Sequence, residues 1–234
     1  TDGEDFFYFQ STTRRSRGED DTALAALSRQ AILVPCSLHQ ISPPLVLTRA
    51  PQPLPDDCYV KVGRMLHFHP EDLDKSAVWP LMIKEAQVCE ILMNHPHRNV
   101  TRYYGYVEKD GLMTGLYYKR YRQTLDDAVK KGAIPRSDIE SSLDQIKEGI
   151  DHLHGLGLVH NNINPSNIML DTDSTLVIID FDSCRKPGES MLEGKYGTFP
   201  FSNEETTSTF ENDFYGVEKT HEWMDKFYDE QVIG

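Results

Sequence analysis

The stretch from His160 to Asp182 holds side chains that are well suited to binding a metal ion and a phosphate. Asn162, Asn167 and Asp180 supply amide and carboxylate oxygens within this short segment. Oxygen ligands of this kind suit a hard divalent cation such as Mg²⁺, which usually binds substrate phosphates at the same time. The residue types therefore predict metal-assisted phosphate chemistry, provided that the fold brings the three side chains to one point.

Two apolar runs are expected to position these side chains. Residues 168–170 (Ile-Met-Leu) and 176–179 (Leu-Val-Ile-Ile) are separated by the turn sequence Asp-Thr-Asp-Ser at 171–174. Short apolar runs bounded by turn residues are typical of buried strands. We therefore expect a hairpin whose ends carry the three polar side chains, all facing one spot.

A long amphipathic helix is expected to lead into the same stretch. Its apolar residues recur at steps of three and four and form one stripe: Ile139, Leu143, Ile146, Ile150 and Leu153. Ser137 and Glu140 have the spacing of a capping box at its start. Gly155 and Gly157 follow its end, and the chain then passes directly into the stretch that begins at His160.

At this point the sequence resembles the protein-kinase superfamily. The catalytic loop of kinases reads H-R-D-x-x-x-x-N and is followed by D-F-G. Here His160–Asn162 precedes Asn167, and Asp180–Asp182 reads D-F-D. The wording HNNINPSNIML with VIIDFDS looks most like small kinase-like proteins of filamentous fungi, and it is also similar to the aminoglycoside/choline phosphotransferase branch. Two residues depart from the kinase pattern: Asn162 replaces the catalytic Asp, and Asp182 replaces the Gly of D-F-G.

The resemblance implies an α+β, two-lobed protein-kinase-like fold. It would comprise a small N-terminal antiparallel sheet with one helix, called αC in kinases, and a shortened, mainly helical C-terminal lobe. We expect a flexible tail at residues 1–22, the N-lobe at 23–121 and the truncated C-lobe at 122–234. The alternative for the tail is an arm whose aromatic residues 6–9 dock on the folded domain or on a partner. Residues 22–34 are expected to form a short helix that runs into a strand, and residues 45–48 are a second strand candidate.

The resemblance also assigns a nucleotide lysine. Cys58–Val62 alternates as a strand does and is similar to the V-A-I-K strand of kinases, so Lys61 would contact the α- and β-phosphates. The following segment, Trp79–Asn94, has helical apolar spacing and resembles the αC helix. Glu85 would pair there with Lys61, and Glu90 is the competing candidate.

Residues 112–118 read as the last strand of the N-lobe, and Lys119–Tyr121 as the hinge between the lobes. The resemblance implies that the hinge backbone, around Lys119 and Tyr121, binds an adenine edge of the cofactor. Tyr117 or Tyr118 would lie near the entrance to the cleft, although either ring can equally be an ordinary core tyrosine.

The segment between Gly18 and Gly63 contains no glycine. Kinases cover the ATP phosphates with a glycine-rich loop, because glycine lets backbone N–H groups approach the phosphates closely. Any loop here, such as Leu38–Pro44, must act without glycine. We expect weaker ATP binding, or phosphates held mainly through the metal.

Two features after the loop complete the resemblance. Gly197–Pro200 is similar to the G-T-x-x-[YF] of an activation segment, and Asp213 in DFYGV would brace the catalytic loop as in kinase helix F. Because Asn161 replaces the loop arginine, the loop has no arginine to pair with a phosphorylated activation segment, and we expect no need for such phosphorylation. His160 is expected to be a structural hydrogen-bonding residue rather than a base.

These assignments predict a protein that binds ATP and Mg²⁺, with Lys61, Asn162 and Asp180 as the catalytic set and Asn167 and Asp180 as metal ligands. Lys61, Glu85 and Asn167 would also hold the nucleotide. The acceptor is a Ser/Thr or a small-molecule hydroxyl. An amide cannot take up a proton at neutral pH, so Asn162 makes transfer weak or absent. The alternatives are an impaired phosphotransferase and a pseudokinase that acts as a binding module.

Bulk properties fit an intracellular, cytoplasmic protein. The 234 residues suffice for one two-lobed domain with a sizeable core, and the net charge of −13 argues against nucleic-acid or membrane partners. The four cysteines form no C-x-x-C pair and are expected to be reduced thiols. No apolar run approaches the roughly 20 residues of a membrane span.

Overall fold

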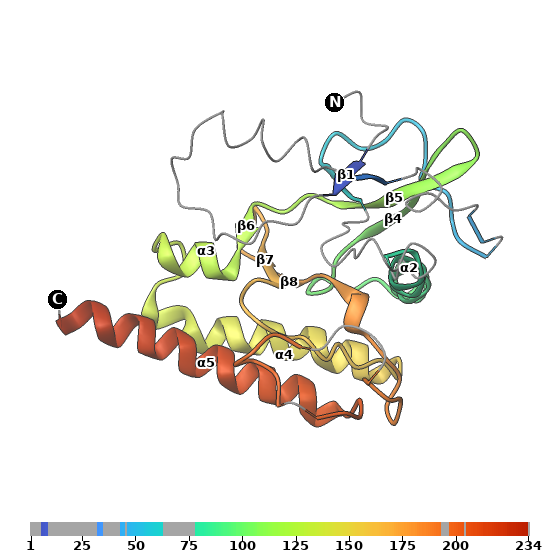
Figure 1. The fold of residues 1–234 in the computed structure, drawn as a ribbon. Helices are drawn as coiled ribbons and strands as arrows, with labels where there is room; N and C mark the ends of the chain where they lie inside the picture. Colours follow the sequence, from blue (N-terminus) through green and yellow to red (C-terminus); the bar gives the residue numbers. More distant parts are fainter. Residues whose placement is uncertain are drawn as a thin grey trace.

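The computed structural model describes residues 6–8, 32–34, 43–44, 46–62, 78–192, 197–203 and 205–233. A strand-rich part and a helical part lie one above the other in Figure 1, with the strands β4 and β5 above and the helices α4 and α5 below. This arrangement confirms the predicted α+β fold with a small antiparallel sheet and a mainly helical second half.

The N-terminal sheet has the order β3-β5-β4, and both pairs are antiparallel. It consists of β3 (Cys58–Lys61), β4 (Tyr103–Lys109) and β5 (Leu112–Lys119). Asp110 and Gly111 join β4 to β5 with φ values of 54° and 79°. Positive φ at both central residues is typical of the type I′ turn, which matches the twist of a hairpin.

Helix α2 (Val78–Asn94) packs against β4 and β5 and lies below them in Figure 1. Its buried residues Met82, Ala86 and Cys89 follow the predicted helical spacing. A separate pair of short strands, β1 (Phe6–Tyr8) and β2 (Ile32–Val34), is antiparallel. β1 falls in the segment for which a tail is expected, and β2 at the end of the predicted 22–34 element.

The predicted strand at 45–48 is wrong. Val46 and Leu47 lie in a turn, and the only pairing nearby in the described chain is an isolated bridge between Arg49 and Tyr106. The segment instead crosses β4 closely at Gly105, where an added Cβ would lie 2.5 Å from the Ala50 nitrogen. Gly105, at φ 124°, has no side chain and so leaves room for the backbone of residues 48–50 to cross β4. The segment makes this one close contact with β4 and does not form a strand along it.

The helical part begins with β6 (Gln123–Thr124) and α3 (Leu125–Lys130), which is capped by Thr124: its Oγ1 accepts a hydrogen bond from Asp127 N at 3.1 Å. Next come η3 (Arg136–Asp138) and α4 (Ile139–Gly155), whose predicted apolar stripe is buried. The last helix, α5 (Phe210–Ile233), lies alongside α4 in Figure 1.

The capping box predicted for α4 is wrong. Ser137 lies inside the preceding 3₁₀ turn and donates its hydroxyl to Asp138 Oδ1 at 2.8 Å, so it does not reach the third helical amide. Asp138 is the N-cap and makes no capping bond with its side chain. Its carbonyl oxygen accepts from the hydroxyls of Ser141 (3.0 Å) and Ser142 (2.7 Å).

The predicted hairpin is confirmed as β7 (Ile168–Leu170) and β8 (Leu176–Ile178), antiparallel with Ile168 opposite Ile178. β6 extends this sheet on the side of β7. A short 3₁₀ turn, η4 (Phe181–Ser183), follows β8 and contacts α2. The hairpin therefore lies between the two halves of the molecule, where its polar ends can meet the N-terminal sheet.

Among the described helices, none combines the length and the apolar composition that a membrane crossing requires.

Candidate active site

Lys61 lies between two carboxylates from distant parts of the chain. Its Nζ is 2.8 and 2.7 Å from the two carboxylate oxygens of Glu85 on α2, and 2.5 Å from Oδ1 of Asp180 after β8. Glu90, the competing candidate, instead accepts from the backbone and hydroxyl of Thr48 at 2.7 Å each. The structure thus brings together the three charged residues that the sequence suggested and selects Glu85 as the partner of Lys61.

Burial and mutual attraction set the charges of this cluster. Burial disfavours the charged ammonium, but the carboxylates of Glu85 and Asp180 outweigh it and raise the pKa of Lys61. Glu85 is 1% exposed, and this burial raises its pKa, with Lys61 partly offsetting the effect. One ammonium faces two carboxylates, and the nearby Asp182 carboxylate adds further negative charge that also raises the pKa of Lys61. This excess of negative charge suits a divalent cation.

Tyr118 holds the other side of Glu85. Its hydroxyl donates to Glu85 Oε1 at 3.0 Å and lies 3.4 Å from the Cys89 sulfur. The Tyr118 ring is buried and packs against Tyr103. Tyr118 is therefore a core tyrosine that fixes the Glu85 carboxylate, a role that sequence spacing did not indicate.

The backbone of the catalytic-loop segment is braced by a buried carboxylate. Asp213 on α5 is fully buried and accepts from the amides of His160 (2.9 Å) and Asn161 (2.7 Å). The ring of His160 bridges Ile179 O at 2.9 Å through Nε2 and the Asn162 amide at 3.2 Å through Nδ1. With both ring nitrogens engaged by the backbone, His160 acts as a structural residue.

Asn161 connects the loop to η4 and to the segment around residues 208–212. Its φ is 61°, and its side-chain nitrogen lies within hydrogen-bonding distance of Ser183 O (3.3 Å) and Ser208 Oγ (3.0 Å). Its side-chain oxygen accepts from Asn212 Nδ2 at 2.9 Å. Asn161 stands at the position where kinases carry an arginine, and its neutral amide holds residues 208–212 against the loop.

Asn162 is surrounded by other amides. Its side-chain oxygen accepts from the backbone and the hydroxyl of Thr198, at 3.0 Å each, and from Asn164 Nδ2 at 3.0 Å. Its backbone carbonyl accepts from Asn164 and Asn167, again at 3.0 Å. The sequence did not predict that Thr198 and Asn164 contribute to this site, because neither residue shares a periodic pattern with Asn162.

Asn167 and Asp180 are neighbours across the hairpin. The Ile179 amide donates to Asn167 O at 2.9 Å, which places Asp180 one residue away. Since Asn167 Nδ2 donates to the loop, its side-chain oxygen is the end left for a cation. Asp180 has a left-handed backbone, φ 67° and ψ 78°, a strained conformation often found at functional sites.

The described side chains include no cluster of three His, Cys, Asp or Glu residues that could hold a metal ion. Asn167 and Asp180 fit Mg²⁺ in another way, because this ion usually takes one or two protein oxygens and completes its shell with phosphate and water. No protein-only cage is therefore needed, and the two oxygens together with the negative charge around Lys61 suit a phosphate-bound ion.

The side chains of Lys119 and Tyr121 lie elsewhere. Lys119 Nζ pairs with Asp171 Oδ2 at 2.6 Å and sits 5.6 Å from the centre of the Tyr121 ring. Both side chains line a hollow of about 840 Å³ that also includes Arg98 and Arg102 and is not lined by Lys61. The structure therefore does not bring these two side chains to the Lys61 cluster.

Part of the hinge backbone is also engaged. The amide of Lys119 donates to Arg102 O at 2.9 Å, and that of Arg120 donates to Asp57 O at 2.6 Å. An adenine edge would therefore have to use the Tyr121 amide or the hinge carbonyls. The glycine-free loop candidate Leu38–Pro44 falls largely outside the described residues, which cover only its last two prolines.

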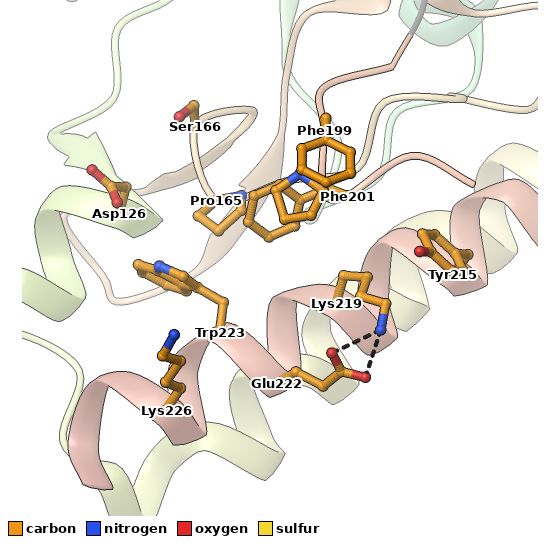
Figure 2. Close-up of a pocket in the computed structure, with 11 residues that line it drawn as sticks. Asp126, Pro165, Ser166, Phe199, Phe201, Tyr215, Lys219, Glu222, Trp223 and Lys226 are labelled. Carbon is orange, nitrogen blue, oxygen red and sulfur yellow. Dashed lines mark hydrogen bonds and ion pairs between the residues drawn. The ribbon is translucent and has the colours of Figure 1, made fainter. Parts of the chain in front are cut away.

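An aromatic pocket borders the loop on the side of α5. It measures about 540 Å³, and Figure 2 shows Pro165 of the loop near Phe199 and Phe201, with Trp223 of α5 on the facing side. Lys219 and Glu222 pair along α5 at 2.8 Å. Phe199 is 79% exposed, so the pocket offers apolar surface against which an apolar side chain of another molecule could pack.

Comparison with known proteins supports the same assignment. A family model described as the protein kinase domain matches residues 70–223. The chain is 33% identical over 132 residues to a serine/threonine-protein kinase/endoribonuclease IRE1 of Hypocrea jecorina, which covers 52% of this chain and 10% of that protein.

Two further relatives are similar over shorter stretches. The MAP kinase kinase kinase SSK2 of Saccharomyces cerevisiae is 32% identical over 111 residues, 47% of this chain and 7% of that protein. A probable serine/threonine-protein kinase MRK1 homolog of Encephalitozoon cuniculi is 30% identical over 109 residues, 44% of this chain and 34% of that protein. The chain thus matches well under half of the length of each of these relatives. The family model covers more than half of the chain, and together with the fold it shows that the chain belongs to the protein kinase family.

Proposed function

We propose that this chain binds ATP with Mg²⁺ and transfers the γ-phosphoryl group weakly or not at all. The observation that carries the proposal is the Lys61 ammonium held between Glu85 and Asp180 next to a loop whose base position is an amide. Lys61 would face the phosphates, and Asn167 and Asp180 would hold the metal ion. When bound, Mg²⁺ neutralises charge on the β- and γ-phosphates.

The acceptor step lacks a base. In phosphoryl transfer the nucleophilic hydroxyl loses its proton as it attacks phosphorus, and a positioned base typically contributes about 10²–10⁴ in rate. The Asn162 side chain accepts hydrogen bonds through its oxygen from Thr198 and Asn164 and cannot take up that proton. His160 cannot substitute, because the backbone engages both of its ring nitrogens.

Two observations favour a polypeptide Ser/Thr hydroxyl over a small-molecule acceptor. The aromatic pocket of Figure 2 lies directly beside Ser166 of the loop and offers Phe199 and Trp223 to an extended apolar segment. The relatives named above are described as serine/threonine or MAP kinase kinase kinases. The likeness of the loop to small-molecule phosphotransferases supports the alternative acceptor.

A pseudokinase that serves as a binding module is the second candidate, and the neutral amide at position 162 favours it. Asn162 is then native to a protein that uses nucleotide only as a stabilising ligand. In the first candidate it is an inactivating change in an enzyme whose other parts are intact.

Thermal unfolding with ATP tests the proposal. A ligand present at 100 times its Kd stabilises the folded state by about 2.7 kcal/mol. We expect the unfolding temperature to rise with ATP and Mg²⁺ and to rise much less when EDTA removes the metal. No rise at millimolar ATP with Mg²⁺ would contradict nucleotide binding. The remaining hypothesis would then be a binding module that has no nucleotide ligand.

A further inference from the structure

The side-chain amide of Asn162 is held in one orientation. Its Oδ1 accepts from the backbone N–H of Thr198 at 3.0 Å, as well as from the Thr198 hydroxyl and Asn164 Nδ2. A backbone N–H can only donate, so the end of the amide that faces Thr198 must be the oxygen. The NH₂ group of Asn162 therefore points away from Thr198.

This NH₂ group is neither hydrogen-bonded nor fully buried. Asn162 is only 4% exposed, yet its Nδ2 has no acceptor among the described residues. Nor does it belong to the described side-chain atoms that are fully buried without a partner, which are Asn99 Oδ1, Tyr103 OH and Gln123 Nε2. An unbonded atom that is not sealed in must be reachable from outside, and here it lies beside Asn167, whose amide bonds the Asn162 carbonyl.

The loop presents no positively charged side chain that could bind an anion in place of Asn162. Residues 160–167 contain no lysine or arginine. Asn164 uses both N–H bonds of its NH₂ group on the two oxygens of Asn162, and Asn167 uses one of its two N–H bonds on the Asn162 carbonyl. An amide NH₂ group donates hydrogen bonds and accepts none, so it cannot hold a hydroxyl by its proton. It matches an oxygen that carries negative charge, and hydrogen bonds to charged groups are the strong ones.

We infer that Asn162 binds a phosphoryl oxygen, at the position where kinases place the base. This inference rests on the proposed function, because it names the ligand group that the nucleotide cleft grips. Asn162 then presents a hydrogen-bond donor where a kinase presents an acceptor. It holds the terminal phosphoryl group of ATP and does not prepare a hydroxyl to attack it. The protein consequently favours ATP over ADP and retains the triphosphate.

Affinities for ATP and ADP test this directly. Both are measured by calorimetry with Mg²⁺ on the wild type and on Asn162→Ala and Asn162→Asp. Loss of one hydrogen bond to a charged group lowers affinity by roughly tenfold or more. We expect ATP to bind the wild type at least about tenfold more tightly than ADP, and both variants to lose that preference while binding ADP as before. Asp should lose more than Ala, because a carboxylate repels the phosphoryl group.

Asn94→Asp is the matched control, since Asn94 is exposed at the end of α2 and the change adds the same charge outside the cleft. It should leave the ATP preference intact. An ATP-to-ADP ratio that is the same in the wild type and both Asn162 variants overturns the inference and leaves nucleotide binding standing. Failure of the wild type to bind either nucleotide overturns the proposed function itself.

A second arm identifies the source of the phosphoryl group. Inorganic phosphate is titrated into the ADP–Mg²⁺ complex of the wild type and of Asn162→Ala. If the group belongs to the nucleotide, phosphate adds nothing and the ATP arm alone responds to the substitution. If phosphate binds the wild-type complex and not the variant, Asn162 grips a separate phosphoryl ligand. No response of either arm to Asn162→Ala overturns the inference.

Discussion

The cluster around Lys61 consists of charged side chains, whereas the loop around Asn162 consists of neutral ones. Lys61, Glu85 and Asp180 are three charged groups in contact, largely withdrawn from water. Asn162, Asn164 and Asn167 are three neutral amides, and the side chains of Asn164 and Asn167 both donate hydrogen bonds to Asn162. In a kinase the first set binds phosphate and metal, and the residue at the position of Asn162 is the base that handles the acceptor hydroxyl. The contrast separates the two tasks: this chain keeps the charges that binding needs and lacks the base that transfer needs.

Asn162→Asp should have the largest effect, because it restores an acceptor for the hydroxyl proton. With saturating ATP and Mg²⁺ and a generic serine/threonine polypeptide, turnover should rise by about 10²–10⁴. Labelled phosphate transferred and released measures it. Asn94→Asp is the charge-matched control. Unchanged turnover in Asn162→Asp would show that more than the base is missing and would favour the binding-module account.

Lys61→Met should strongly weaken the charged cluster. It leaves Glu85 and Asp180 facing each other without a cation, and removing one partner of a buried ion pair typically costs about 3–5 kcal/mol. Because the Lys61 side chain is 27% exposed, we expect the lower end of that range. Urea unfolding measures the loss. Lys84→Met, at an exposed lysine on α2 next to Glu85, should change stability little; equal losses in the two variants would contradict a special role for Lys61.

The charged cluster also predicts a pH dependence. Lys61 has a folded-state pKa above its ordinary value of 10.5, so its contribution to stability is fully present below pH 10.5 and is lost as the pH rises further. The difference in unfolding free energy between the wild type and Lys61→Met should therefore be constant at neutral pH and shrink in strong alkali. A difference that grows with alkaline pH would have the wrong sign.

Asp213→Ala should destabilise the neutral loop. It leaves the buried amides of His160 and Asn161 without their acceptor, and each unpaired buried group costs about 1–3 kcal/mol. A loss of about 2 kcal/mol or more in urea unfolding is expected. Glu218→Ala, an exposed carboxylate on the same helix, serves as the control. If the two variants lose the same small amount, the brace does not hold the loop.

Tyr118→Phe should have the smallest effect of the series. It removes one hydroxyl from the Glu85 carboxylate, a bond to a charged group worth about 1.5–3 kcal/mol. The ring itself and its packing against Tyr103 are retained. A loss near the lower figure, seen in urea unfolding and absent in Tyr117→Phe, would support this role.

Sequence reasoning succeeded where the signal was periodic or matched a spaced motif. The hairpin of 168–178, the buried stripe of α4 and the bracing Asp213 all followed from such patterns. It failed where one tertiary contact decided the outcome. The strand expected at 45–48 became a turn and a crossing over Gly105, and Ser137 turned to Asp138 instead of capping α4.

Within the site, the charged residues could be predicted and their neutral neighbours could not. Lys61, Glu85 and Asp180 occupy positions that a motif marks. Thr198 reaches Asn162 from 36 residues away and Tyr118 reaches Glu85 from 33 residues away, and neither contact leaves a pattern in the sequence. The side-chain directions of Lys119 and Tyr121 also depend on packing, which carries them into the hollow beside Asp171.

The state of the nucleotide on the wild-type protein tests the central claim most directly. The protein is incubated for hours with labelled ATP and Mg²⁺, separated from free nucleotide, denatured, and its bound nucleotide is resolved into ATP and ADP. The account predicts that nucleotide is recovered and that it is almost entirely intact ATP, whereas Asn162→Asp returns mainly ADP. Recovery of mostly ADP from the wild type, or of no nucleotide at all, would contradict a site that binds without transferring.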